Sequence, residues 1–267
     1  IKTRFDALKA KNEKALISYV TAGDPHPQHT VSIMHALVEA GTDLIEVGVP
    51  FSDPMADGPV IQQACERALK YDTSLADILQ MVKDFRKNDP NTPIILMGYQ
   101  NPIEIYGVER FAQDAKGLVD GVITVDLPPE ECTEINQLYR EVDIDSIFLM
   151  APTTDISRIR RISEIASGFL YYVSFKGITG ANSLDIDSVS SKLSEIRAVT
   201  GLPLAVGFGI KDAETAAAVA AVADAVVVGS AIVSLIATNQ EDMPTALKEV
   251  KSLLQGIKSA LDNAGSI

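Results

Sequence analysis

Short runs of Val, Ile and Leu alternate along the chain with longer stretches in which apolar residues recur at helical spacing. Eight of the apolar runs predict strands: Leu16–Thr21, Leu44–Val47, Ile94–Met97, Gly121–Thr124, Ser146–Leu149, Leu170–Val173, Leu204–Val206 and Ala225–Val228. Most of these runs lack the alternation of polar and apolar residues that a half-exposed sheet requires. They are typical of parallel strands that are buried on both faces.

Amphipathic stretches between these runs predict helices, among them Val31–Ala40, Leu75–Lys87, Pro129–Arg140, Ile156–Ala166, Val189–Val199 and Ala213–Val222. Eight strands that alternate with helices over about 250 residues favour a (β/α)8 TIM barrel of the α/β class over an open doubly wound sheet. Extra helices are expected over Thr3–Lys11 and after the eighth strand. Since no linker or block of charge interrupts the pattern, residues 1–267 are expected to form a single domain.

The segment Ala216–Ala237 is apolar enough to imitate a membrane span, with only Asp224, Gly229 and two serines outside its apolar residues. A carboxylate near its centre and the Gly-Ser break argue against a span. We interpret the segment as an Ala-rich helix, a turn, a Val-rich strand and the start of a second helix. No membrane association is therefore expected.

Charge and cysteine content narrow the class of protein further. The chain has 23 Lys and Arg against 36 Asp and Glu, a net charge of −13, which disfavours general binding of nucleic acid but allows a small phosphorylated ligand. Two cysteines, Cys65 and Cys132, are too few for a disulfide framework or a cysteine-based zinc site. With no apolar leader near the N-terminus, a reduced, cytoplasmic protein is expected.

Glu46 is the most unusual residue, because it stands inside an apolar strand where an ionised carboxylate is costly. Strand alternation places it with Leu44 and Gly48 on one face, which near the mouth of a barrel opens on the active site. No basic residue lies in its strand or in the following loop, so an acid–base role is favoured over an ion pair. A raised pKa would suit a group that both gives and takes protons.

Asp57 lies eleven residues later, in a loop rich in Pro, Gly and Asp. An Asp before Gly-Pro is usually a turn former or a cap, but this loop would close over Glu46. Asp53 has a weaker claim on direct chemistry. The two carboxylates, Glu46 and Asp57, are the candidate acid–base groups.

Glycine segments at the last three strand ends predict a phosphate site. They are Gly177-Ile178-Thr179-Gly180, Gly207-Phe208-Gly209 and Gly229-Ser230, and a helix follows the last of them. Glycines let backbone N–H groups approach an anion, and the helix N-terminus adds its dipole. Lys176 is either a cation for this site or a solvated loop residue.

Other reactive motifs are missing from the sequence. None of the three histidines stands in a metal-ligand pattern, and no Gly-x-Ser-x-Gly, Walker loop or dinucleotide fingerprint occurs, so no metal is expected. No lysine occupies a strand interior as a Schiff-base candidate. With these motifs excluded, the sequence favours acid–base chemistry by carboxylates on a substrate that is held by its phosphate.

Long blocks of the sequence resemble the tryptophan synthase α subunit family. They are 19–25 (YVTAGDP), 40–59 (AGTDLIEVGVPFSDPMADGP), 97–102 (MGYQNP), 125–128 (VDLP), 171–174 (YYVS), 177–180 (GITG), 207–210 (GFGI) and 229–231 (GSA). The resemblance covers nearly the whole chain, and the block from Pro50 to Pro59 is highly specific. The family often has an Arg directly after the Ser of strand six, whereas Phe175 and Lys176 follow Ser174 here. Closure contacts of that loop are therefore not carried over.

The resemblance implies a lyase that cleaves indole-3-glycerol phosphate to indole and glyceraldehyde 3-phosphate. Catalytic roles then fall to Glu46 as acid/base, to Asp57 at the indole N–H and to Tyr171 beside Glu46. The implied indole pocket is Tyr19, Met97, Ile123, Val125, Leu149 and Thr179, and the implied phosphate contacts are Gly180, Phe208, Gly209, Gly229 and Ser230. No cofactor is implied for this chain.

The resemblance also implies a partner, the tryptophan synthase β subunit, which carries pyridoxal phosphate in an αββα heterotetramer. Its docking surface is expected on the catalytic face at Asp53, Pro54 and Asn101, with their neighbours Met55, Gln100 and Pro102. Three alternatives stay open. They are a stand-alone lyase that releases indole, a non-catalytic regulatory barrel, and another cofactor-free phosphate barrel enzyme such as a sugar-phosphate epimerase or isomerase.

Overall fold

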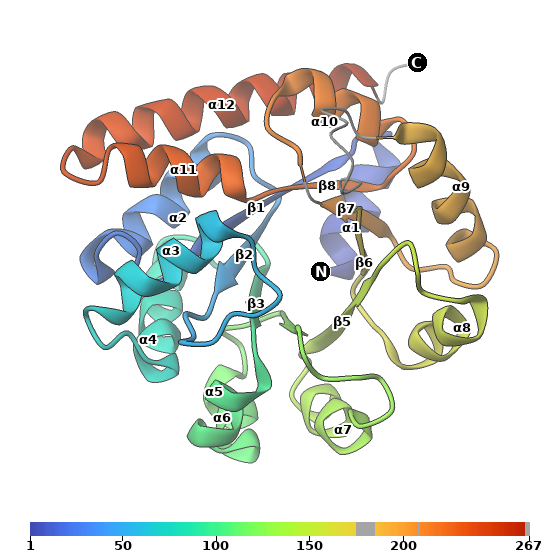
Figure 1. Ribbon diagram of the computed structural model, residues 1–267, viewed down its shortest axis with the longest axis horizontal. Coiled ribbons are helices and arrows are strands. Elements are labelled where there is room, and N and C mark those ends of the chain that lie inside the picture. Colours follow the sequence, from blue (N-terminus) through green and yellow to red (C-terminus); the bar gives the residue numbers. More distant parts are fainter. Residues whose placement is uncertain (175–184, 208, 265–267) are drawn as a thin grey trace.

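The computed structural model describes residues 1–174, 185–207 and 209–264. Eight parallel strands close into a barrel in chain order, and β8 pairs with β1 (Figure 1). The strands are β1 Ala15–Thr21, β2 Leu44–Gly48, β3 Ile94–Gly98, β4 Gly121–Thr124, β5 Asp145–Met150, β6 Leu170–Val173, β7 Leu204–Gly207 and β8 Ala225–Val228. The predicted (β/α)8 barrel is confirmed, and each predicted strand lies within the observed one.

Helices cover the barrel, most of them in an outer ring, with α1 behind the strands in the view of Figure 1. They are α1 Lys2–Ala10, α2 Thr30–Glu39, α3 Pro59–Leu69, α4 Leu75–Arg86, α5 Gln100–Tyr106, α6 Val108–Ala115, α7 Thr133–Glu141, α8 Ile156–Ile165, α9 Ile186–Arg197, α10 Ala213–Ala220, α11 Ser230–Thr238 and α12 Met243–Ala264, with a 3-10 turn at Pro27–His29. The extra N-terminal helix and the extra helix after the eighth strand are both confirmed. No helix in the described part of the chain is long and apolar enough to cross a membrane.

Two predicted helix starts were wrong by three or four residues. The helix expected from Pro129 begins at Thr133, because residues 128–131 form a turn closed by the Glu131 N–H on the Pro128 carbonyl. The helix expected from Val189 begins at Ile186, since the Asp185 side chain caps it by accepting a hydrogen bond from the Ser188 N–H. The predicted starts at Leu75, Ile156 and Ala213 are confirmed, and the other predicted helix ends differ from the observed ones by one or two residues.

Apolar side chains fill the barrel as well as the space between strands and helices. Ile17, Leu44, Ile95 and Ile123 belong to the interior cluster, whereas Ile45 and neighbouring residues on alternate strand positions pack against the helices. Phe5 and Leu8 of α1 join the interior cluster, and α1 thereby closes the barrel at the N-terminal ends of the strands. The described part of the interior is a packed core, and α1 covers it at the N-terminal strand ends.

A repeated hydrogen-bond arrangement fastens the N-terminal end of the barrel. A side-chain oxygen placed before each even-numbered strand accepts a hydrogen bond from a backbone N–H of the preceding odd-numbered strand: Asp43 from Leu16 at 2.9 Å, Asp120 from Ile94 at 2.8 Å, Ser167 from Ser146 at 3.0 Å and Asp224 from Leu204 at 2.8 Å. In all four places the N–H of the accepting residue returns a bond to the carbonyl of its donor. All three carboxylates also pair with arginines, Asp43 with Arg4 at 3.9 Å, Asp120 with Arg86 at 2.6 Å and Asp224 with Arg197 at 2.9 Å.

Candidate functional site

Glu46 lies in β2 with its side chain in the barrel interior and none of its surface exposed. Neither carboxyl oxygen has a hydrogen-bond partner among the described residues. Burial raises the pKa of Glu46 to about 8, because an ionised carboxylate is poorly solvated there. The sequence prediction of a buried, unpaired carboxyl is confirmed, and at neutral pH this group holds its proton.

Two tyrosines approach Glu46, Tyr19 from the neighbouring strand β1 and Tyr171 from β6, and glycines make room for both. Tyr19 stands beside Glu46 in the β1–β2 register, and its hydroxyl lies where a Cβ on Gly48 would be. The Tyr171 hydroxyl lies in the same way against Gly207 of β7. Burial raises the pKa of the Tyr171 phenol, and the charge of Glu46 acts in the same direction. Glycine is required at both positions because any side chain would displace a phenol.

Asp57 lies in the loop between β2 and α3, half-buried at the rim of the barrel. Its Oδ2 accepts a hydrogen bond of 3.0 Å from the Tyr99 hydroxyl, and that hydroxyl accepts one from the Ala56 N–H. Burial raises the pKa of Asp57, while the Tyr99 hydrogen bond lowers it by favouring the ionised form. The pKa of Tyr19 is raised chiefly by burial. The charges of Asp57 and Glu46 raise it further, so this phenol lies near both carboxyl groups.

Tyr99→Phe is expected to raise the pKa of Asp57, because the hydrogen bond that favours the carboxylate is lost while the ring and its packing remain. Burial raises this pKa and the Tyr99 hydrogen bond lowers it, so removing the hydrogen bond leaves the raising effect of burial. Carbon-13 NMR titration of the Asp57 carboxyl measures it. Tyr106→Phe is the control, because that hydroxyl donates to the surface residue Asp114. An unchanged Asp57 titration would show that Tyr99 does not tune the carboxylate.

Three residues of the predicted apolar wall belong to the interior cluster or pack against it. Ile123 is buried in the interior cluster, and Met97 and Leu149 pack against that cluster with part of their surface open. A cavity of about 220 Å³ opens at the ends of β4 and β5, and Val125 and Leu149 are part of its lining. Val173 of β6, which the sequence analysis did not single out, packs against the interior cluster like Met97 and Leu149. Thr179 lies outside the described residues.

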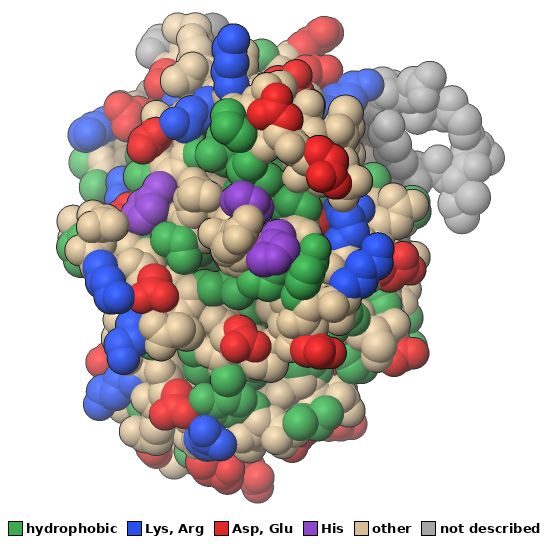
Figure 2. Space-filling model, turned by 90° about the vertical axis from the view of Figure 1, so that its left-hand side faces the viewer, with side chains coloured by type: hydrophobic (Ala, Val, Ile, Leu, Met, Phe, Trp, Pro, Cys, Tyr) green, Lys and Arg blue, Asp and Glu red, His purple; other side chains and the backbone are tan. Residues whose placement is uncertain are grey.

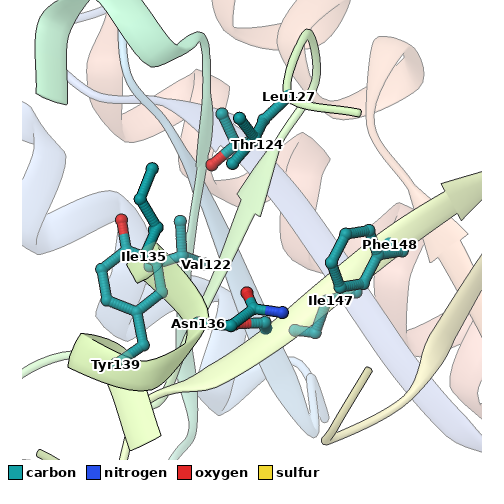
Figure 3. A pocket seen from close by; sticks show the side chains of 9 residues that line it. Val122, Thr124, Leu127, Ile135, Asn136, Tyr139, Ile147 and Phe148 are labelled. Carbon is teal, nitrogen blue, oxygen red and sulfur yellow. The ribbon is translucent and has the colours of Figure 1, made fainter. Parts of the chain in front are cut away.

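A second cavity lies outside the barrel wall, between β4, β5 and α7 (Figure 3). Val122, Asn136, Tyr139 and Phe148 are among the residues that line it. At about 10 Å³ it has room for roughly one water molecule. It is too small for a substrate and is separated from Glu46 by the strands.

The end of β8 provides the described part of the predicted phosphate site. Gly229 precedes α11, whose first residue Ser230 is exposed, and the first N–H groups of a helix have no partner within it. Gly209 is exposed and has a φ of +79°, which a residue with a side chain rarely adopts. Backbone donors and a helix N-terminus suit an anion here. Gly180, Phe208 and Lys176 lie outside the described residues.

The predicted docking residues are on the surface of the β2–α3 loop and α5. Asp53 and Asn101 are exposed, and Pro54 is half-buried. Two large apolar side chains lie in the same segments with most of their surface in solvent, Met55 at 85 % and Ile105 at 80 %. Sequence reasoning missed Ile105, because helical spacing alone does not show which apolar residue of a short helix faces outward.

The described histidines and acidic residues are not arranged as a metal centre. Figure 2 shows histidine side chains near one another on one face, and the rings of His26 and His29 lie 6.2 Å apart while His26 packs on Tyr71 at 4.3 Å. Within the ranges that the structure describes, no three His, Cys, Asp or Glu residues are placed to hold a metal ion. Positive and negative side chains are interspersed on the same face (Figure 2).

The geometry therefore offers two carboxyl groups with different surroundings. Glu46 is protonated at neutral pH and can deliver its proton to a buried ligand atom. Asp57 receives a hydrogen bond that favours its charge, so it can stabilise a positive charge at the rim. Tyr99 was quoted in the sequence motif without a role, and only the fold reveals its contact with Asp57.

Comparison with known proteins gives one consistent result. The family model described as "Tryptophan synthase alpha chain" matches residues 5–262. The chain is 58 % identical over 263 residues to the tryptophan synthase alpha chain of Thioalkalivibrio sulfidiphilus, covering 98 % of this chain and 99 % of that one.

Solved structures agree with the sequence matches. Tryptophan synthase subunit alpha from Legionella pneumophila has a TM-score of 0.92 at 46 % identity, with 98 % of each chain covered. A chain of the tryptophan synthase complex from Pyrococcus furiosus has a TM-score of 0.83 at 36 % identity, covering 92 % of this chain and 99 % of that one.

Proposed function

The chain belongs to the tryptophan synthase alpha chain family, and from that premise we propose that Glu46 and Asp57 carry out its reaction. The reaction is the reversible retro-aldol cleavage of indole-3-glycerol phosphate to indole and glyceraldehyde 3-phosphate, a carbon–carbon lyase step of tryptophan biosynthesis. The observation that carries the assignment is the Glu46 carboxyl, fully buried and without a partner among the described residues.

Glu46 first acts as an acid. Breaking the bond between indole C3 and the glycerol chain requires a place for the bonding electrons. Protonation of C3 by the Glu46 carboxyl creates that place, because it leaves a positively charged N1 that accepts the electrons. A pKa of about 8 keeps the proton on Glu46 until the substrate arrives.

Asp57 stabilises the charge that this step creates. Its carboxylate lies at the rim, where it can accept the indole N1–H, and Tyr99 favours its ionised form. The ionised Glu46 then takes the proton of the glycerol hydroxyl as the aldehyde forms. Tyr171 lies close enough to Glu46 for the charge of Glu46 to raise its pKa. Its hydroxyl takes part in this proton transfer.

The remaining residues hold the substrate. Tyr19, Met97, Ile123, Val125 and Leu149, together with Thr179, form the proposed indole pocket. The phosphate is proposed to bind the backbone at Gly209, Gly229 and Ser230, with Gly180 and Phe208, and the dipole of α11 adds to these contacts. The whole site needs no positively charged side chain.

Gly229→Val is expected to weaken binding of glyceraldehyde 3-phosphate about tenfold, while indole binding stays within about twofold. A Cβ on Gly229 would meet Tyr19 at 3.4 Å, an ordinary contact distance, so the effect is expected from the methyl groups of valine, which crowd the backbone donors at the start of α11. Isothermal titration with each ligand measures both effects. Gly201→Val is the matched control, because nothing lies near a Cβ there. Equal losses for indole would contradict the proposed phosphate position.

The proposed partner is the tryptophan synthase β subunit, with pyridoxal phosphate bound in that subunit and an αββα assembly in the cytoplasm. Indole is apolar and escapes readily, so docking a second active site at the mouth of this one retains it. The proposed surface contains Asp53, Pro54 and Asn101, and the exposed Met55 and Ile105 lie in the same two segments. Exposed apolar side chains of this size suit a protein interface.

The test is indole release from indole-3-glycerol phosphate, measured with and without β subunit. We expect β subunit to raise the rate, and Asp53→Lys to weaken this activation more than it weakens basal turnover. Asp6→Lys on α1, at the closed end of the barrel, is the control. A chain that releases indole but neither binds β subunit nor responds to it is a stand-alone lyase, and one without lyase activity contradicts the proposal.

A further inference from the structure

Helix α3 carries the proposed catalytic loop into position. It begins at Pro59, two residues after Asp57, so the place of the helix sets the place of the carboxylate. Its buried face, with Ile61 and Cys65, packs on Tyr19 of β1 and on Val233 of α11. The helix therefore contacts both a residue of the proposed indole pocket, Tyr19, and the proposed phosphate-binding helix α11.

The first turns of α3 hold the loop by its backbone. The Gln62 side-chain amide donates a hydrogen bond of 2.8 Å to the Asp57 carbonyl and a longer one of 3.4 Å to the Pro54 carbonyl. The Asp57 N–H in turn donates to the Pro54 carbonyl at 3.0 Å. Any rotation or shift of α3 is thus transmitted to the Asp57 main chain.

The last turn of α3 is tied to the loop after β1. Arg67 Nε and Nη2 donate to the two oxygens of Asp24 at 2.6 and 3.0 Å, a bidentate arrangement that fixes both side chains. Asp24 is only 2 % exposed. Burial raises the pKa of Asp24, and the Arg67 hydrogen bonds and charge oppose that shift. Beside the pair, Gly23 packs so closely on Thr73 that a Cβ would overlap the threonine side chain.

We propose that Arg67 is a positioning residue for the lyase reaction, whose bidentate ion pair with Asp24 fixes α3 and thereby the Asp57 carboxylate over the barrel mouth. This inference rests on the proposed function of Asp57. The planar fork of arginine specifies an orientation, which a lysine in the same place would not supply. Because a displacement of about 1 Å can cost on the order of 10²-fold in rate, a small tilt of the helix is enough to matter.

Arg67→Lys tests the proposal while keeping the positive charge beside Asp24. We expect kcat for indole-3-glycerol phosphate cleavage to fall about tenfold with KM changed less than about twofold, since the pocket and phosphate site remain. Arg86→Met is the matched control, because it breaks an ion pair of 2.6 Å at the closed end of the barrel. It should lower the melting temperature and leave kcat unchanged. A wild-type kcat in Arg67→Lys would overturn the inference and leave the proposed function standing.

A double-mutant cycle separates positioning from general damage. If Arg67 acts through Asp57, Arg67→Lys should have almost no further effect on kcat once Asp57→Asn is present. A further tenfold loss in that background would overturn the inference, because the ion pair would then act independently of Asp57. A wild-type kcat in Asp57→Asn alone would refute the proposed function as well, so the two failures are distinguishable. Melting curves of all four proteins establish that each is folded.

Discussion

Glu46→Gln is expected to lower kcat for indole-3-glycerol phosphate cleavage by at least on the order of 10²–10⁴-fold, because one carboxyl group serves both proton transfers. Glutamine has nearly the same shape as the protonated glutamic acid, so the pocket and the phosphate site stay intact. Binding of indole and of glyceraldehyde 3-phosphate should therefore change little. Steady-state kinetics and ligand titration on the same preparation measure both parts.

The same substitution is expected to stabilise the folded protein. Glu46 has a pKa of about 8 when folded against an ordinary 4.5, so the folded state binds the proton more tightly than the unfolded chain. The unfolded chain ionises from pH 4.5 upward, and wild-type stability therefore falls as the pH rises until the folded carboxyl ionises near pH 8. The amide introduced by Glu46→Gln cannot ionise, so the advantage of the variant grows across this window to a few kcal/mol, on the order of 1.4 kcal/mol per pH unit.

Urea unfolding of both proteins at pH 5, 7 and 8 measures this difference. The gap in unfolding free energy should widen from pH 5 to pH 8. Near-normal turnover in the variant would refute the catalytic assignment, and a gap that does not change with pH would refute the buried, protonated state of Glu46.

Asp57→Asn is expected to reduce kcat by on the order of 10²-fold or more, because a neutral amide cannot balance the charge that forms on indole N1. Asp57→Glu keeps the charge at the cost of a longer side chain, and should retain more activity than Asp57→Asn. The order of the two variants in kcat distinguishes a charge effect from a hydrogen-bond effect. If the asparagine variant were the more active of the two, the hydrogen bond alone would account for the role of Asp57.

Much of the fold followed from the sequence because parallel barrel strands are buried on both faces. Such strands are continuous apolar runs, and all eight were located by that pattern. Helix starts were harder, since they depend on single caps: the Asp185 side chain begins α9 early, and the turn at Pro128 delays α7. That the chain is one domain stays a prediction.

The site was predictable where one residue contradicted its surroundings. Glu46 in an apolar strand carried that signal, and its burial is confirmed. Tyr99 and Arg67 gave no such signal, because a tyrosine beside a strand and an arginine on a helix are ordinary. Their roles depend on contacts 42 and 43 residues away in the chain, which only the closed barrel creates.

The four hydrogen-bonded pairs stabilise one end of the barrel, the end at which the strands begin. Each pair joins a strand start to its neighbour through two bonds, at the opposite end from the proposed site. Opening of a loop at the mouth therefore breaks none of these bonds, and local fluctuations there do not propagate into global unfolding. The barrel therefore keeps its shape through bonds that do not involve the loops of the proposed site.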